Sequence, residues 1–148
     1  MQIRHILLTT DLSIESLRPC LAVGELAQRA KARITLLHVV YEFQLAPHGA
    51  PLAPPITPLD SEREVRAAEK TLLEQKKLLG EGAPVVTAVV TGDRVHEAIA
   101  KYAKSHRVDL IALSTHGRTG FRHFALGSVA EALLRESEVP VLVFPRRE

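Results

Sequence analysis

Five short runs of aliphatic residues recur along the 148-residue chain, and stretches with helical periodicity separate them. The runs cover residues 3–9, 33–40, 85–90, 108–113 and 139–144, and most of them are nearly continuous rather than alternating. A strand that is apolar at successive positions is buried on both faces, which is typical of a parallel sheet covered by helices. This pattern restricts the fold more than any other feature of the chain.

The intervening stretches carry apolar residues at i, i+3 and i+4 spacing, as an amphipathic helix requires. The four stripes are Leu17, Cys20, Leu21, Gly24 and Ala27; Val65, Ala68, Leu72 and Leu79; Val95, Ala98, Ile99, Tyr102 and Ala103; and Leu126, Val129, Ala130, Leu133 and Leu134. Ser13 and Asp93 are predicted N-caps of the first and third helices, and Gly80 and Gly82 are expected to end the second. The alternation predicts a single-domain α/β fold with a doubly wound, five-stranded parallel sheet.

One segment interrupts this alternation. Residues 45–59 contain five of the nine prolines, and proline removes backbone donors and blocks a helix interior. The segment is predicted to be a long surface loop, of the kind that is either functional or disordered.

Composition excludes several classes of protein. The net charge is only +2, which does not favour nucleic-acid binding. The single Cys20 excludes an internal disulfide and a cysteine zinc cage, and the seven histidines lack the compact spacing of a protein metal site. No apolar run reaches the ~18 residues that a membrane span needs, and residues 1–11 do not resemble a signal peptide. A cytoplasmic protein that contacts neither membrane nor nucleic acid is therefore expected.

Chemistry-bearing residues follow the first and fourth apolar runs. In an open α/β sheet, ligands bind beyond the carboxyl ends of the strands, where the strand order reverses. The first run is followed by Thr10, Asp11, Leu12 and Ser13, and the fourth by residues 114–120 and 126–129. If these two strands are neighbours, both segments face one crevice.

The second segment has the features of a phosphate site. Gly117, Gly120 and Gly127 allow backbone N–H groups to approach an anion, and Ser128 opens a helix whose N-terminus attracts negative charge. A valine at position 127 should therefore abolish nucleotide binding and leave the fold intact. Across the crevice, the Asp11 carboxylate can accept hydrogen bonds from an adenine amino group or a ribose hydroxyl.

These motifs resemble those of the universal stress protein family over nearly the whole chain. The resemblance rests on residues 10–13, 36–39, 114–120, 126–131 and 139–143, and on the family's G-x2-G-x9-G-[S/T] pattern. Gly117, Gly127 and Ser128 match this pattern, whereas Ser114 stands at its first glycine. The site that the resemblance and the crevice imply comprises Thr9, Thr10, Asp11, Val39, Ser114, His116, Gly117, Arg118, Thr119, Gly120, Gly127, Ser128 and Val129.

The resemblance further implies strand order 3-2-1-4-5 and a homodimer formed along the last strand, residues 139–144. Its expected ligand is ATP, with Mg²⁺ or Mn²⁺ carried on the phosphates, in a sensor or regulator of the stress response. The chain lacks the lysine frame of a P-loop NTPase, so at most slow hydrolysis is expected. The alternative, motivated by Ser114, is a dimeric interaction module of the same family that binds no nucleotide and docks a protein partner.

Overall fold

The computed structural model describes residues 2–42, 58–115 and 126–145. Its centre is a sheet of five parallel strands, β1 (His5–Thr9), β2 (Arg33–Tyr41), β3 (Val85–Gly92), β4 (Leu110–Ser114) and β5 (Val141–Phe144). The strand order β3-β2-β1-β4-β5 confirms the predicted doubly wound topology. Every residue of β1 is buried, as a nearly continuous apolar run predicts for a central strand.

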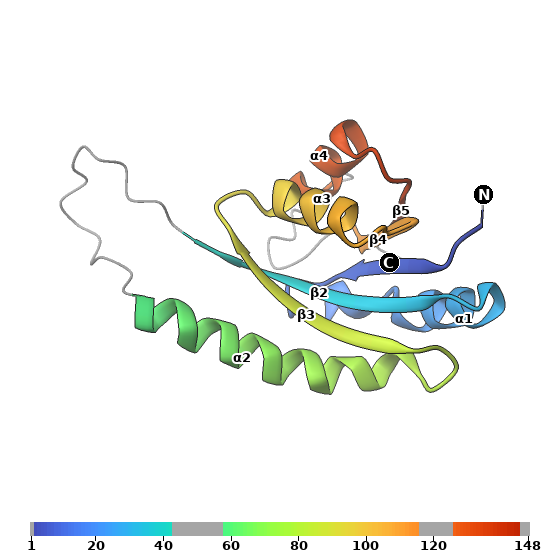
Figure 1. Ribbon diagram of the computed structural model, residues 1–148, viewed down its shortest axis with the longest axis horizontal. Coiled ribbons are helices and arrows are strands. Elements are labelled where there is room, and N and C mark those ends of the chain that lie inside the picture. Colours follow the sequence, from blue (N-terminus) through green and yellow to red (C-terminus); the bar gives the residue numbers. More distant parts are fainter. Residues whose placement is uncertain (1, 43–57, 116–125, 146–148) are drawn as a thin grey trace.

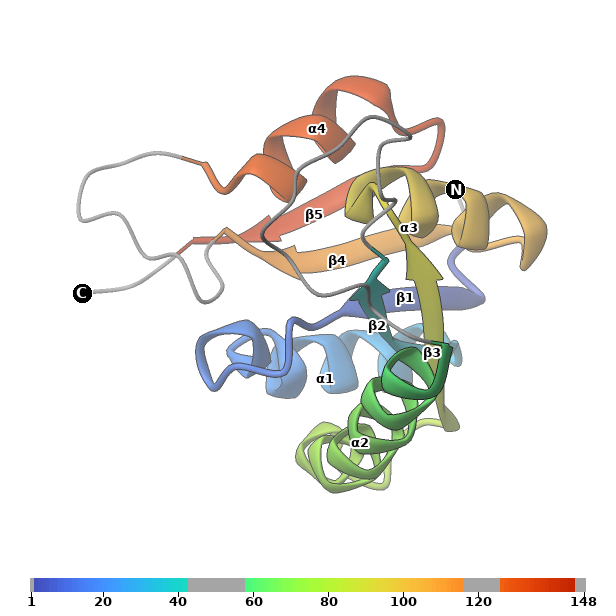
Figure 2. The ribbon, with the colours of Figure 1, turned by 90° about the vertical axis from the view of Figure 1, so that its left-hand side faces the viewer.

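Four α-helices cover the sheet, two on each face (Figures 1 and 2). One face carries α1 (Cys20–Ala30) and α2 (Pro58–Lys76), and the other carries α3 (Val95–Ser105) and α4 (Ser128–Glu136). Two short 3₁₀ helices, η1 (Glu15–Leu17) and η2 (Lys77–Leu79), precede α1 and follow α2. Gly80 ends η2 with a φ of 73°, a left-handed conformation that glycine adopts without steric cost, so the predicted stop is confirmed.

Successive residues of the central strands point into two separate cores. Leu8 and Leu36 pack with Val23 of α1 and Leu72 of α2, whereas Leu7 and its neighbours face α3 and α4. All of these side chains are at most a few per cent exposed. The free energy gained by burying each one, about 1.5–3 kcal/mol, makes the two-sided burial of the sheet the main source of stability.

The structure corrects parts of the predicted helices. Leu21 and Leu134 are 74% and 51% exposed, so they lie off the buried stripes of α1 and α4, and Leu126 precedes α4 with 37% exposure. Ser13 does not cap α1, because the chain first makes η1 and α1 begins only at Cys20. Residue 94, not Asp93, is the N-cap of α3.

The predicted proline-rich loop is shorter than expected at its C-terminal end. Helix α2 begins at Pro58, because proline's fixed φ suits the first helical turn, where the missing N–H has no intrahelical partner. The rest of that segment, residues 45–57, lies outside the described residues. Among the residues that are described, no helix is long and apolar enough to cross a membrane.

The sheet has a step at its carboxyl edge beside β1. The pairing of β1 with β2 ends at Thr9 and Leu37, whereas the pairing of β2 with β3 continues to Tyr41 and Gly92. Strand β1 has β2 on one side and β4 on the other, so the strand order reverses at β1. The end of β1 is therefore the switch point where an open α/β sheet binds its ligands.

Candidate functional site

A pocket of about 540 Å³ opens at this switch point, between the ends of β1, β2 and β4 and the first turn of α4. Its volume lies within the range of small-molecule sites, roughly 300–1,000 Å³. Eight of the thirteen predicted site residues line it: Thr9, Thr10, Asp11, Val39, Ser114, Gly127, Ser128 and Val129. The other five predicted residues, His116 to Gly120, lie outside the described residues.

Thr10 anchors the wall of the pocket that β1 contributes. Its backbone N–H donates to the carbonyl oxygen of Leu37 at 2.9 Å, and its own carbonyl oxygen accepts from Nδ1 of His38 at 2.8 Å. Its hydroxyl contacts Oγ of Ser16 at 2.7 Å and accepts from the N–H of Leu12 at 2.9 Å. Because every polar group of this buried residue is bonded, Thr10 supports the site rather than offering a group to a ligand.

Asp11 forms a tight turn at the mouth of the pocket. Its Oδ1 accepts hydrogen bonds from the N–H of Ser13 at 3.0 Å and from the Ser13 hydroxyl at 2.5 Å. This is an Asx-turn, in which a side-chain carboxylate mimics a backbone carbonyl. Asp11 is half-buried and lines the pocket, so the turn fixes a negative charge at this end of the cavity.

The N-terminus of α4 also lines the pocket. The N–H groups of Ser128, Val129 and Ala130 occupy the first three helical positions, where no intrahelical acceptor is available. Gly127, the residue that precedes them, has no side chain with which to cap them. The positive end of the helix dipole and these three donors suit an anionic group.

Gly127 itself does not behave as expected. Its N–H donates to the carbonyl oxygen of Thr115 at 2.8 Å, so it is not open to phosphate. A Cβ at this position would collide with that same carbonyl oxygen. The expectation that a valine here leaves the fold intact is therefore wrong, because the glycine is required for close backbone packing.

The middle of the pocket is apolar. Leu37 and Val39 come from β2, Leu113 from β4, and Val95 and Ile99 from α3. Val39, Leu113 and Ile99 are nearly fully buried within the core that faces α3 and α4. An uncharged, apolar group such as a base suits this region, in a cavity that a carboxylate and a helix N-terminus also line.

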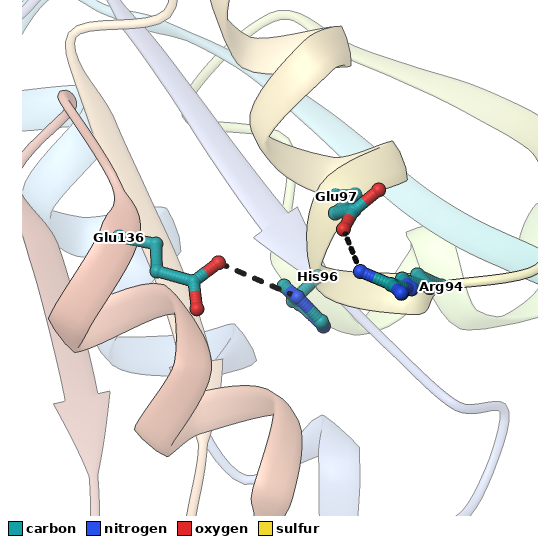
Figure 3. Close-up of polar contacts among 4 residues, drawn as sticks. All are labelled: Arg94, His96, Glu97 and Glu136. Carbon is teal, nitrogen blue, oxygen red and sulfur yellow. Dashed lines mark hydrogen bonds and ion pairs between the residues drawn. The ribbon is translucent and has the colours of Figure 1, made fainter.

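Helices α3 and α4, which both contribute to the pocket, are joined at their outer edge. Nε2 of His96 lies 3.5 Å from Oε2 of Glu136, and Figure 3 shows the two side chains pointing toward each other across the helices. Arg94 and Glu97 pair at 2.6 Å within the first turn of α3 (Figure 3). Because at least one side chain of each pair is more than half exposed, water screens both contacts and they add little stability. The shared core of Ile99, Ala130 and Leu133 therefore holds the helices together.

Sequence reasoning missed three polar residues around the site. His38 fixes the Thr10 carbonyl, Tyr41 lines the outer rim of the pocket, and the buried Gln75 reaches the β1 turn from α2. The predicted strand 33–40 contains His38 and ends just before Tyr41, so it predicts that both lie at the carboxyl edge of the sheet. Only their roles were unassigned. Nothing in the sequence indicates that Gln75 is part of the site, since a glutamine within a charged helix is expected to be solvent-exposed.

Comparison with known proteins finds a family model and relatives that match most of the chain. The model of the Universal stress protein family matches residues 2–145. Universal stress protein MJ0577 from Methanocaldococcus jannaschii is 32% identical over 126 residues, which is 77% of each chain. Universal stress protein MJ0531 from the same organism is 30% identical over 148 residues, covering 98% of this chain and 85% of its own length.

A solved universal stress protein in complex with cAMP shares the fold. It superposes with a TM-score of 0.68 over 99% of this chain and 100% of its own, at 20% sequence identity.

Proposed function

Because this chain belongs to the universal stress protein family, we propose that it binds an adenine nucleotide, ATP, in the pocket at the end of β1. It acts as a sensor or regulator in the stress response, holding the nucleotide or hydrolysing it only slowly. The observation that carries this proposal is the make-up of the pocket, which is lined by both the Asp11 carboxylate and the first turn of α4, whose N–H groups have no intrahelical acceptor.

The base and ribose occupy the end of the pocket near β1 and β2. The apolar surfaces of Val39 and Leu37 bury one face of the purine, and the backbone of Val39 bonds its edge. Asp11 accepts a hydrogen bond from the adenine amino group or from a ribose hydroxyl, through the oxygen that the Asx-turn does not require. Thr9 completes the wall beside the base.

The phosphates lie at the N-terminus of α4. The N–H groups of Ser128 and Val129 donate to phosphate oxygens, with the helix dipole adding favourable electrostatics. Ser114, at the end of β4, is half-buried beside them and offers a hydroxyl. Residues 116–120 supply the remainder of the phosphate loop in this proposal. Mg²⁺ or Mn²⁺ accompanies the phosphates and is not held by a protein cage.

Slow turnover follows from the groups that surround the pocket. Fast phosphoryl transfer needs a positioned base or water-orienting residue and cationic groups around the transferred phosphoryl. Among the residues that the structure describes, the pocket lining offers one carboxylate, Asp11, whose Oδ1 is bonded to Ser13 and which this proposal assigns to the adenosine part of the ligand. A protein that senses nucleotide by holding it fits this lining better than an ATPase does.

A homodimer along β5 completes the proposal. The carbonyl oxygens of Pro140 and Phe144 accept from β4, so the backbone groups of Val141 and Val143, which alternate with them, point away from the sheet. All four residues of β5 are half-buried. An apolar edge strand with unpaired backbone groups is a template for pairing with a second copy of the chain.

Nucleotide binding is tested by removing one backbone N–H donor from the first turn of α4 without disturbing the helix. Ser128 is the first helical residue, where proline is tolerated, and Gly127 before it has the extended conformation (φ −61°, ψ 147°) that a following proline requires. Ser128→Pro should weaken ATP binding about tenfold, as loss of one charge-assisted hydrogen bond predicts. Ser128→Ala, which keeps the N–H, is the matched control and should bind ATP nearly as the parent does.

Calorimetric titration with ATP, adenosine and inorganic tripolyphosphate measures these affinities. Adenosine should bind both variants equally, since it does not reach α4. If folded parent protein shows no saturable ATP binding below millimolar concentration, the nucleotide proposal is wrong. The alternative, a dimeric interaction module that docks partners without nucleotide, is then favoured. A rise in melting temperature on adding ATP would contradict this alternative.

A further inference from the structure

We propose that Gln75 is a positioning residue of the pocket, whose buried amide sets the turn between β1 and η1 and thereby the direction of Asp11. Gln75 belongs to α2 and does not line the cavity. It stands 63 positions after Leu12, which it contacts. The inference rests on the proposed function, because it assigns to Gln75 a part in reading the base end of the nucleotide.

Both polar atoms of the Gln75 side chain bind the same turn. Nε2 donates to the carbonyl oxygen of Leu12 at 3.1 Å, and Oε1 accepts from the hydroxyl of Thr10 at 3.1 Å. The residue is only 7% exposed, on a helix whose other polar residues are mostly at the surface. A buried amide is tolerated where its donor and acceptor are both paired, and here the turn that carries Asp11 supplies both partners.

The turn needs such support because of its backbone. Leu12 has a φ of 69°, a left-handed conformation that is unfavourable for a residue with a side chain. Within the turn, Leu12 N–H donates to the Thr10 hydroxyl at 2.9 Å and Ser13 N–H donates to Asp11 at 3.0 Å. Gln75 adds a side-chain donor to the Leu12 carbonyl, on the far side of the peptide that joins Leu12 to Ser13.

The chemistry of the turn also determines which way the amide points. If the amide were reversed, Oε1 would face the Leu12 carbonyl oxygen, and two acceptors would oppose each other. The nitrogen therefore faces Leu12, and the Thr10 hydroxyl donates to Oε1. Gln75→Glu keeps the size and shape of the side chain and replaces the donor that faces Leu12 with a carboxylate oxygen, which also adds a negative charge. Gln75→Met removes the same donor without adding a charge.

The first experiment compares ligands that reach different ends of the pocket. In the full chain carrying Gln75→Glu, we expect the affinities for ATP and adenosine to fall about tenfold and that for inorganic tripolyphosphate to stay within about twofold. Leu72→Ala is the matched control, since Leu72 is fully buried on α2 and its apolar side chain makes no hydrogen bond to the turn. It should lower the melting temperature and leave all three affinities unchanged. Unaltered adenosine affinity in folded Gln75→Glu protein overturns the inference.

The second experiment needs no ligand. Amide hydrogen exchange at Leu12 and Ser13 should become at least about tenfold faster in Gln75→Glu and Gln75→Met, and remain unchanged relative to neighbouring core amides in Leu72→Ala. If the parent protein binds neither ATP nor adenosine, the proposed function fails, and faster exchange in both variants still supports Gln75 as the residue that holds the turn. Exchange that stays at the parental rate contradicts the inference, whatever the ligand result.

Discussion

The amide nitrogen of Gly127 lies 2.8 Å from the carbonyl oxygen of Thr115, so the residue before α4 is bonded directly to the residue after β4. The N–H of Thr115 in turn donates to the carbonyl oxygen of Phe144 at 2.9 Å. These two bonds connect β5, β4 and α4 at one point. They place the first turn of α4, with the N–H groups of Ser128 and Val129 that have no intrahelical acceptor, at the end of the sheet.

Gly127→Ala should destabilise the protein as well as impair the site. The backbone at this position is extended and suits any residue, but the added Cβ would collide with the Thr115 carbonyl oxygen. Relieving the collision requires the chain to move, at a cost of about 1–3 kcal/mol. Thermal unfolding should show a melting temperature lower by several degrees. Ser128→Ala, one residue along and exposed, is the control; an unchanged melting temperature in Gly127→Ala would mean that the two segments are not packed this closely.

Asp11→Asn should distinguish the role of Asp11 in the turn from its role in ligand binding. An asparagine retains the acceptor that holds Ser13, and it replaces the remaining carboxylate oxygen with an amino group. If Asp11 accepts from the adenine amino group, ATP affinity should fall about tenfold and ITP, which carries a keto oxygen at that position, should lose much less. Competition titrations measure the ratio. Equal losses for the two nucleotides, together with weak binding of 2′-deoxy-ATP to the parent protein, assign Asp11 to the ribose instead.

Val143→Pro should dissociate the proposed dimer. The N–H of Val143 points away from β4, so proline removes a donor from the outer edge without breaking the ladder inside the sheet. Sedimentation should show a dimer for the parent protein and a monomer for the variant, and circular dichroism should show that the variant is folded. A variant that still sediments as a dimer places the interface on another surface.

We expect protonation of His5 to make the protein less stable in mild acid than at neutral pH. Burial lowers the pKa of His5 below 6.5, and the positive charge of Arg33, whose Nη2 lies 3.2 Å from Nδ1, acts in the same direction. The unfolded chain therefore takes up the proton first. Stability is fully present above about pH 6.5 and is lost as the pH falls from there through the folded-state pKa.

The check is a comparison of melting temperatures at about pH 7.5 and about pH 5.5, on either side of the ordinary histidine pKa. His5→Gln, which keeps a polar side chain beside Thr35 but does not titrate, should lose less stability over this interval than the parent protein. An equal loss in both proteins would mean that other groups cause the acid sensitivity.

Much of the site was predictable because its parts are local. Thr9, Thr10 and Asp11 directly follow a buried strand, and Ser128 and Val129 directly follow the glycine that precedes a helix. The doubly wound topology brings these two segments to one edge of the sheet without any further information. These residues line the pocket as the strand ends predict, because the apolar runs locate those ends to within two residues, whereas their contact with a ligand stays a prediction.

The errors arose where the chain makes irregular turns. Ser13 was expected to cap α1, but the left-handed conformation of Leu12 and the 3₁₀ turn that follows delay the helix to Cys20. Leu21 and Leu134 fit the helical stripes, yet they are exposed because the helices are rotated relative to the predicted stripes. The spacing of apolar residues does not predict these rotations, because they depend on how each helix packs on the sheet.

The amino-acid sequence by itself determined the architecture, since apolar runs of strand length can be covered only by placing the amphipathic helices on both faces of one parallel sheet. Only the tertiary structure decided which backbone groups remain open. The N–H of Gly127 is bonded to the Thr115 carbonyl oxygen, and Gln75 is buried and bonded to Leu12 and Thr10. Both outcomes depend on distances between segments that are far apart in the chain, and a hydrogen bond exists only when folding has brought its donor and acceptor to about 3 Å.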